Sequence, residues 1–152
     1  MLRARFSESL KTAMKAHDQR AVSTLRMMLS SLKNRDIAAR DKGNTSGIDD
    51  AEISQMLQGM VKQRRESIVL YEQGNRPELA AQESEEIAII ESFLPKQLSD
   101  TELEQAVKAA IAEAGAQTAK DMGRVMAALR EKHAGQMDFG KASGAAKRLL
   151  QS

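Results

Sequence analysis

The chain has 152 residues, a formal net charge of +2 and no cysteine, a size that suits one compact domain or two small helical ones. The absence of cysteine excludes disulfides, zinc–thiolate sites and a thiol nucleophile. Three phenylalanines and one tyrosine are the only aromatic residues, and helix-favouring residues such as Ala, Leu, Glu, Lys and Arg dominate. This composition predicts an all-α protein.

The charges are unevenly distributed along the chain. Residues 1–48 hold ten Lys and Arg against four Asp and Glu, and residues 120–152 hold seven against three. Residues 49–95 are acidic, with ten Asp and Glu against four Lys and Arg. The basic ends either face an anionic partner or complement the acidic middle inside the protein.

The N-terminal third predicts two helices. Apolar residues recur at helical spacing over about 2–16, beginning with Leu2 and Phe6. Asp18 is a candidate N-cap for a second amphipathic helix. The polar stretch KGNTSG (42–47) then predicts a loop, because it combines two glycines with small polar residues.

Two further helices are predicted before residue 95. Asp49 or Asp50 caps a long helix, and Gly74 is expected at the left-handed position that follows its last turn. Pro77 suits the first turn of the next helix. That helix ends before Pro95, because the residue preceding a proline avoids the helical conformation.

The remainder predicts a three-helix tail. SDTE (99–102) is a capping box, and Gly115 ends the helix that it starts. A second helix is expected over Thr118–His133, and Asp138 caps the last one. We therefore expect an all-α fold with a four-helix N-terminal domain followed by a three-helix C-terminal tail domain.

The predicted domain boundaries are 1–95 and 96–152, with a hinge near 95–98. The N-terminus is polar throughout and lacks the continuous apolar stretch of a signal peptide. No run of about 18 apolar residues occurs anywhere in the chain, so no membrane association is expected. These features predict a soluble, cytoplasmic protein.

Known catalytic patterns are largely missing. The two histidines, His17 and His133, are predicted at polar helix ends, so no Ser-His-Asp arrangement is expected. Glu83 and Glu86 give an E-x-x-E spacing without the histidine that a di-metal helix site uses. GQMDFGKA (135–142) imitates a phosphate loop but carries Ala142 where Ser or Thr is required. We expect no catalytic residue, no metal and no cofactor.

Basic residues form two patterns that suit an anionic partner. Arg26, Lys33 and Arg40 are seven residues apart, which puts them on one helix face. The tail carries enough Lys and Arg residues to bind a phosphate backbone, and such binding weakens as the salt concentration rises. Without interleaved aromatics to stack single-stranded bases, we expect folded RNA, recognised by shape. The alternative is that these basic residues lie on solvated helix faces or form ion pairs with the acidic middle of the chain. The basic tail residues are Lys120, Arg124, Arg130, Lys132, Lys141, Lys147 and Arg148.

Gly123 lies in the first turns of the predicted 118–133 helix, where glycine costs roughly 1 kcal/mol relative to alanine. Ala127 follows one turn later on the same side, so the pair makes a smooth surface. Either a neighbouring helix packs against this surface, or an RNA backbone approaches it closely. Both alternatives remain open on the sequence alone.

Three segments resemble the YqeY family, whose name is joined with GatB in the GatB/YqeY domain. They are STLRMMLSSLKNRDI (23–37), the long block KQRRESIVLYEQGNRPELAAQESEEIAIIESFLPKQLS (62–99), and KDMGRVMAALREKHAGQMD (120–138). The last is also similar to the C-terminal tail of GatB, a subunit of the tRNA-dependent amidotransferase. Lys120, Met122, Gly123, Val125 and Met126 match that tail motif.

The resemblance implies an all-α fold and a tRNA-binding accessory protein of the glutamine-dependent carbon–nitrogen ligase family. The chain lacks the Ser-cis-Ser-Lys nucleophile set of the amidase partner, so the resemblance does not imply an active site. An adaptor that docks a tRNA synthetase or an amidotransferase subunit is the alternative. An enzyme built on Glu83 and Glu86 facing Arg64 or Arg65 is a third, although an ion pair between the helices also explains these residues. The candidate tRNA-binding residues are Lys120, Gly123, Arg124, Ala127, Arg130, Lys132, Lys141, Lys147 and Arg148.

Overall fold

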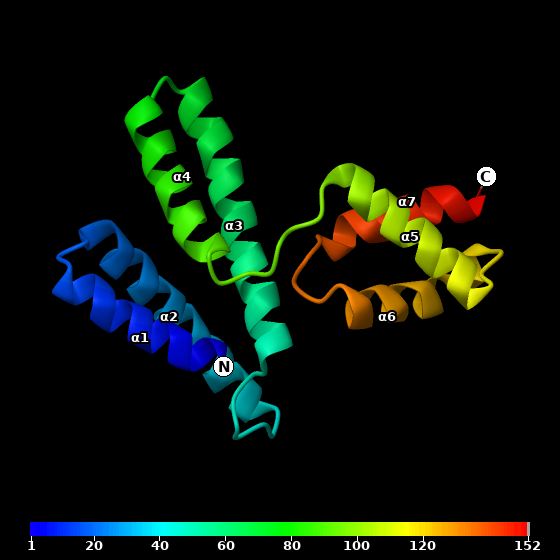
Figure 1. Ribbon diagram of the computed structural model, residues 1–152, viewed down its shortest axis with the longest axis horizontal. Helices are drawn as coiled ribbons and strands as arrows, with labels where there is room; N and C mark the ends of the chain where they lie inside the picture. The colour runs from blue at the N-terminus through cyan, green and yellow to red at the C-terminus, as the bar shows by residue number, and fades with distance from the viewer. Residues whose placement is uncertain (152) are drawn as a thin grey trace. The chain divides into compact units, whose positions relative to one another are not determined.

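A computed structural model describes residues 1–151 (Figure 1). Within this range the chain forms seven α-helices and one short 3₁₀-helix, and no strand occurs among the described residues. The all-α prediction is therefore confirmed. None of the helices in the described range is both long and apolar enough to cross a bilayer.

The chain divides into two compact units, and it passes from the first to the second between Leu94 and Pro95. The first unit contains four α-helices and the second contains three. Residue 152, which belongs to the predicted 96–152 domain, lies outside the described residues. That the units are independent domains with boundaries at 1–95 and 96–152 stays a prediction.

The helices of the first unit begin where local chemistry favours a helix start. The Asp18 side chain accepts a hydrogen bond from the Ala21 N–H at 3.1 Å, and the Asp49 side chain accepts one from the Glu52 N–H at 2.9 Å. Both therefore act as N-caps, as predicted. The four helices are α1 (Leu2–Lys15), α2 (Gln19–Asp41), α3 (Asp50–Gln73) and α4 (Pro77–Glu91).

The turn between α3 and α4 differs from the prediction by one residue. Gly74 has a φ of −85°, whereas Asn75 has a φ of +56°. The left-handed position thus belongs to Asn75, so its assignment to Gly74 was wrong. Asparagine is one of the few residues with a side chain that adopt this conformation readily. Pro77 occupies the first turn of α4, as predicted.

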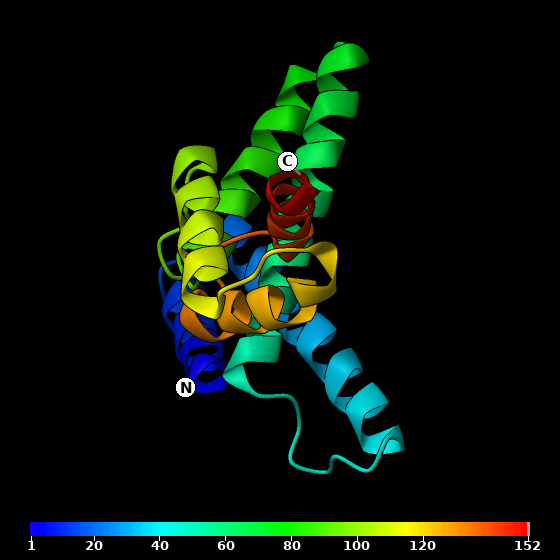
Figure 2. The same cartoon turned by 90° about the vertical axis from the view of Figure 1, so that its right-hand side faces the viewer.

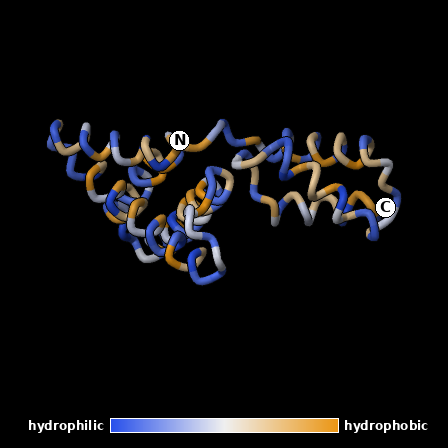
Figure 3. Tube along the Cα trace, turned by 90° about the horizontal axis from the view of Figure 1, so that it is seen from below, coloured by the Kyte–Doolittle hydropathy of each residue, from blue (hydrophilic) through white to orange (hydrophobic). Residues whose placement is uncertain are grey.

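All four helices contribute apolar side chains to the core of the first unit. Phe6, Met28, Leu57 and Ile90 are fully buried, and Phe93 packs edge-on against Phe6 with ring centroids 4.9 Å apart. Orange apolar residues and blue polar residues alternate along the helical traces in Figure 3. This pattern is expected where one side of each helix faces a shared core.

The loop between α2 and α3, which is the teal segment of Figure 2, is held by a bidentate ion pair. The two terminal guanidinium nitrogens of Arg3 donate to Asp36 at 2.6 Å, and one of them also donates to the Ile48 carbonyl at 2.8 Å. The Ile48 N–H donates back to Asp36 at 3.0 Å. Gly47 passes beneath this pair with a φ of +87°, and a Cβ there would lie 2.6 Å from the Arg3 guanidinium.

The second unit starts with the predicted capping box. Ser99 accepts from the Glu102 N–H at 3.2 Å, and the Glu102 carboxylate accepts from the Ser99 N–H at 3.0 Å. Gly115 ends the first helix in the left-handed conformation, as predicted, with a φ of +62°. The elements are α5 (Asp100–Ala114), the 3₁₀-helix η1 (Ala119–Asp121), α6 (Met122–Lys132) and α7 (Phe139–Gln151).

The predicted continuous helix over Thr118–His133 is broken near its start. Residues 119–121 form a 3₁₀ turn, because the Asp121 carboxylate accepts from the backbone N–H groups of Gln117 and Thr118. The α-helix proper begins at Met122. Asp138 caps α7 by accepting from the Gly140 N–H at 2.8 Å, which agrees with the prediction and leaves no phosphate loop at 135–142.

Each helix of the second unit packs against the other two. Val107 of α5, Val125 and Leu129 of α6, and Ala142 and Ala146 of α7 are at most 1% exposed. The predicted hinge segment is anchored within this unit: the Leu98 N–H donates to the Gln136 carbonyl at 2.8 Å, and the Gln97 side chain donates to the Gly135 carbonyl at 2.6 Å.

Candidate nucleic-acid interface

The α6 and α7 helices run antiparallel beside each other. The Arg130 guanidinium, near the end of α6, lies 5.7 Å from the ring centroid of Phe139, the first residue of α7. Further along, α7 contacts η1, which precedes α6. Figure 1 also shows that α7 runs back alongside α6 in the opposite direction. The two helices are therefore neighbours within the second unit, and each carries exposed basic residues.

The α6 helix divides into a core side and a solvent side. Val125, Met126 and Leu129 are buried in the three-helix core. Gly123, Ala127 and Arg130 are exposed and follow the i, i+4, i+7 spacing of a single helix face. The exposed face thus combines two residues that have little or no side chain with one cation.

Gly123 has no packing role in the second unit. A Cβ placed on this residue would meet no atom within 4 Å, when its chain neighbours and the backbone of its own helix are set aside. Among the described residues, no helix of the second unit therefore packs against Gly123. An alanine would raise helix propensity here without a clash, so the fold does not explain why the residue is glycine.

Three of the predicted RNA-binding cations make no ion pair with any residue in the described range. Lys120 on η1, Arg130 on α6 and Lys147 on α7 are all exposed. Arg130 is held over the face of Phe139, which favours a guanidinium through the ring quadrupole. This contact orients Arg130 while leaving its N–H groups available to an acceptor such as a phosphate oxygen.

The other four predicted cations are neutralised within the second unit. Arg124 binds Asp121 at 2.7 Å and also donates to the Ala114 carbonyl at 3.0 Å, which ties α6 to the end of α5. The remaining three pair with acidic side chains of α5. These contacts are Lys132 with Glu113 at 3.1 Å, Arg148 with Glu104 at 3.6 Å and Lys141 with Asp100 at 3.9 Å.

Asp121 organises the start of α6. Hydrogen bonds from the Gln117 N–H, from Arg124 and from the Thr118 N–H lower the pKa of its carboxyl to about 2. The carboxylate therefore stays ionised at neutral pH at the electropositive start of α6. Sequence reasoning did not single out Asp121, although its i, i+3 spacing from Arg124 is a recognised signal for an ion pair on a helix.

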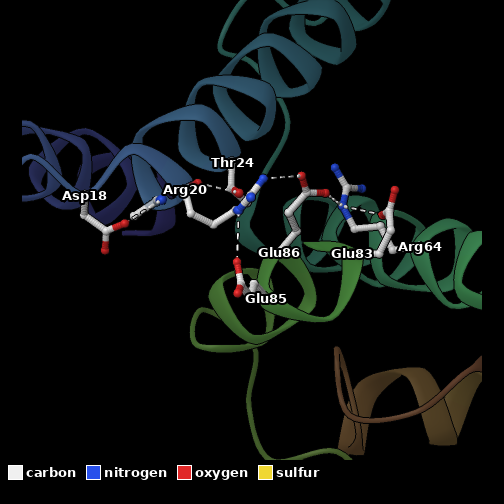
Figure 4. A network of polar contacts seen from close by, with 8 residues as sticks. Asp18, Arg20, Thr24, Arg64, Glu83, Glu85 and Glu86 are labelled. Carbon is white, nitrogen blue, oxygen red and sulfur yellow. Dashed lines mark hydrogen bonds and ion pairs between the residues drawn. The ribbon is translucent and has the colours of Figure 1, made fainter. Parts of the chain in front are cut away.

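Two arginines of the first unit, Arg20 and Arg64, lie instead in a network of carboxylates (Figure 4). Arg64 of α3 donates to Glu86 of α4 at 2.9 Å and lies 4.0 Å from Glu83. Arg20 of α2 donates to Glu85 at 3.0 Å and reaches Glu86 at 4.0 Å. The ion-pair explanation of these glutamates is confirmed, and Arg20 is a member that sequence reasoning missed.

The network links α2, α3 and α4 rather than lining an open cleft of carboxylates. Burial, with a smaller effect from neighbouring Glu86, raises the pKa of Glu83, whereas Arg64 opposes that rise. Arg65, the other arginine considered for this role, pairs with Glu91 at 3.2 Å. Among residues 1–151, no group of three or more His, Asp or Glu side chains is arranged to hold a metal ion.

Comparison with known proteins gives one family and a set of partial relatives. A family model described as "Yqey-like protein" matches residues 3–150. Three curated relatives are named "Altered inheritance of mitochondria protein 41, mitochondrial". The Vanderwaltozyma polyspora protein is 34% identical over 57% of this chain and 45% of its own length. The Lachancea thermotolerans protein is 33% identical over 60% and 46%, and the Saccharomyces cerevisiae protein 32% over 62% and 49%.

The chain thus spans about half the length of these relatives. Their names contradict the prediction of a cytoplasmic protein, because all three are called mitochondrial. The prediction rested on the lack of an apolar leader and of a long apolar run. Neither property distinguishes a cytosolic chain from one that works inside an organelle, so the inference had no physical basis beyond excluding secretion.

Proposed function

The chain belongs to the YqeY family, and from that premise we propose that it is a tRNA-binding accessory protein without an active site of its own. The proposed contact surface is the basic α6/α7 surface, which consists of Lys120, Gly123, Ala127, Arg130 and Lys147. The similarity of residues 120–138 to the tail of the amidotransferase subunit supports tRNA as the RNA class.

The observation that carries this proposal is that cations without a carboxylate partner among the described residues occur together with an exposed, uncovered stretch of helix backbone. Lys120, Arg130 and Lys147 have no carboxylate partner in the described chain, so their charge remains available to phosphates. Gly123 lies between Lys120 and Arg130 along the chain with open space above it. A sugar–phosphate strand can approach such a surface more closely than one covered by long side chains.

Phe139, the aromatic ring beside this surface, is half-buried and lies beneath the Arg130 guanidinium, so it is covered rather than open to base stacking. Recognition would then act mainly through phosphates and shape, as it does for other folded RNAs. Arg124, Lys132, Lys141 and Arg148 contribute less in this account, because their charges are already compensated by Asp121 and by α5.

A protein adaptor is the second candidate, and its support lies in the first unit. Val69 and Leu70, which are adjacent near the end of α3, are 51% and 67% exposed and could contribute an apolar contact to a partner. Met122, which precedes Gly123 in the chain, is half-buried and packs against the three-helix core, and Met126 and Leu129 are buried. The apolar contact that the adaptor alternative required near Gly123 and Ala127 therefore has no support.

Fluorescence anisotropy of labelled bulk tRNA across a KCl series tests the proposal. We expect binding whose log affinity falls linearly with log salt concentration. The variant Lys120→Ala/Arg130→Ala/Lys147→Ala should bind at least about tenfold more weakly, with a salt slope shallower by about three, one unit per lost phosphate contact.

The matched control removes the same net charge from cations that are already paired, in Lys132→Ala/Lys141→Ala/Arg148→Ala. We expect this variant to lose much less affinity than the first. Equal losses in the two variants would mean that only net charge matters, and no binding of wild type at low salt would reject the proposed function.

A further inference from the structure

A groove in the first unit lies between α2 and α3 and has a volume of about 380 Å³. That volume lies within the range of known ligand sites. Its polar lining comes from Arg26, Ser30, Ser31 and Asn34 on α2 and from Gln63 and Arg64 on α3, beside two methionines. Both charged residues of the lining are therefore cationic.

The two arginines of the groove differ in their availability. Arg64 is held by Glu86 and by the Met60 carbonyl at 3.1 Å. Arg26 is exposed and makes no ion pair within residues 1–151. Its charge is therefore available to a ligand, whereas that of Arg64 is shared with the carboxylate network.

The positive charge continues along α2 beyond the groove. Lys33 and Arg40 follow Arg26 at seven-residue spacing, and both are exposed without an ion pair in the described range. A helix rises 1.5 Å per residue, so the three cations extend over roughly 21 Å on one face. A row of this length fits a linear polyanion better than a single small anion.

Next to the α3 residues that line the groove, Met60 and Gln63, lies a further helix glycine whose presence packing does not explain. Gly59 lies inside α3, one turn before Gln63, where glycine costs about 1 kcal/mol relative to alanine. It is exposed, and a Cβ there would meet nothing within 4 Å. Packing does not account for Gly59, but an approaching ligand backbone would.

We propose that this groove, with Arg26, Lys33 and Arg40, binds a strand of RNA through its sugar–phosphate backbone. The three cations bind phosphates, and the hydroxyls and amides of Ser30, Asn34 and Gln63 suit 2′-hydroxyl and phosphate oxygens. The inference rests on the proposed function for the class of ligand, and it assigns the first unit an RNA contact separate from the basic α6/α7 surface.

The test uses the full chain and labelled bulk tRNA in the same salt series. The groove variant is Arg26→Ala/Lys33→Ala/Arg40→Ala. Its matched control, Lys15→Ala/Arg35→Ala/Lys62→Ala, removes three exposed, unpaired cations of the first unit that do not line the groove. We expect the groove variant to bind at least about fivefold more weakly than the control, with a salt slope shallower by about two to three.

A Gly59→Gln variant provides a second readout that retains every charge. It should fold at least as stably as wild type, because glutamine is the better helix former, yet bind tRNA more weakly because its side chain enters the path of the strand. Wild-type affinity in Gly59→Gln, together with equal affinities of the groove variant and its control, would overturn the inference.

The outcomes separate this inference from the proposed function. Weaker binding in the Lys120/Arg130/Lys147 variant alone would support the α6/α7 surface and reject the groove. Weaker binding in the groove variant alone would support the groove and reject the α6/α7 surface. If a protein helix rather than RNA covers the groove, neither groove variant will differ from the control in tRNA affinity, and the inference fails.

Discussion

Cationic side chains in two regions of the molecule have opposite surroundings. In the α2–α3–α4 network Arg20 and Arg64 face Glu83, Glu85 and Glu86, and their charge holds helices together. On the α6/α7 surface Lys120, Arg130 and Lys147 have no carboxylate partner within the described range. The number of basic residues in a segment is therefore a poor guide to an anion-binding surface. The pairing of each cation decides whether its charge is available.

The largest effect is expected from breaking the network of the first unit. Glu86→Ala should destabilise the fold by about 2–3 kcal/mol, because it leaves Arg64, whose side chain is 11% exposed, without its nearest carboxylate. Urea denaturation followed by circular dichroism measures this change. Glu85→Ala on the same helix is the control, with an expected loss below about 1 kcal/mol, since Glu85 is mostly exposed. Equal losses would mean that burial does not set the strength of these pairs.

A somewhat smaller effect is expected at the Arg3–Asp36 pair. The pKa of Asp36 is lowered to about 2, mainly by the hydrogen bond from Arg3. Burial opposes this shift, and the hydrogen bond from the Ile48 N–H adds to it. Asp36→Asn should reduce stability at neutral pH by about 1–2 kcal/mol, because it removes the charge from a bidentate pair.

The pH dependence of this pair has a definite sign. A carboxyl whose folded-state pKa is depressed stabilises the fold above its unfolded-state pKa, here near 3.8, and loses that contribution as the pH falls through about 2. The stability difference between wild type and Asp36→Asn should thus shrink between pH 4 and pH 2. Asp121 titrates in the same pH range. The stability difference between wild type and Asp36→Asn therefore isolates the effect of Asp36, which the wild-type stability curve alone does not. A difference independent of pH would contradict the account.

On the α6/α7 surface, changes should leave the fold intact or improve it. Gly123→Ala should raise stability by up to about 1 kcal/mol, since the added methyl group meets nothing and helix propensity increases. Thermal denaturation measures the effect. Gly47→Ala provides the contrast, because its Cβ would collide with Arg3 at a left-handed position and should destabilise the protein. A destabilising Gly123→Ala would indicate packing at Gly123 after all.

Sequence reasoning predicted the features that depend on neighbouring residues. The caps at Asp18, Asp49 and Ser99 and the glycine stop at Gly115 follow from local hydrogen bonds and backbone conformation, and all four were confirmed. The error at Gly74 was also local, since Asn75 tolerates the left-handed region as well.

Pairing across helices was not predictable in the same way. Whether Lys132, Lys141 or Arg148 has a partner depends on which side of α5 faces α6 and α7, and that follows from packing of the whole bundle. The surroundings of Gly123 also depend on the packing of the whole bundle. The sequence alone therefore could not decide between a packing glycine and a close approach of RNA. The split of the tail helix into η1 and α6 required the Asp121 side chain to outcompete helix continuation.

We would first measure the tRNA affinity of Gly123→Gln beside that of Ala109→Gln, which places the same glutamine side chain at an exposed site of α5. We expect Gly123→Gln to be at least as stable as wild type, and Ala109→Gln to lose less than about 0.5 kcal/mol, because alanine is the slightly better helix former and neither side chain is enclosed. Gly123→Gln should bind tRNA at least about fivefold more weakly, or by roughly 1 kcal/mol, whereas Ala109→Gln should bind as wild type. Unchanged affinity in Gly123→Gln would contradict the claim that RNA approaches the α6 backbone at this glycine.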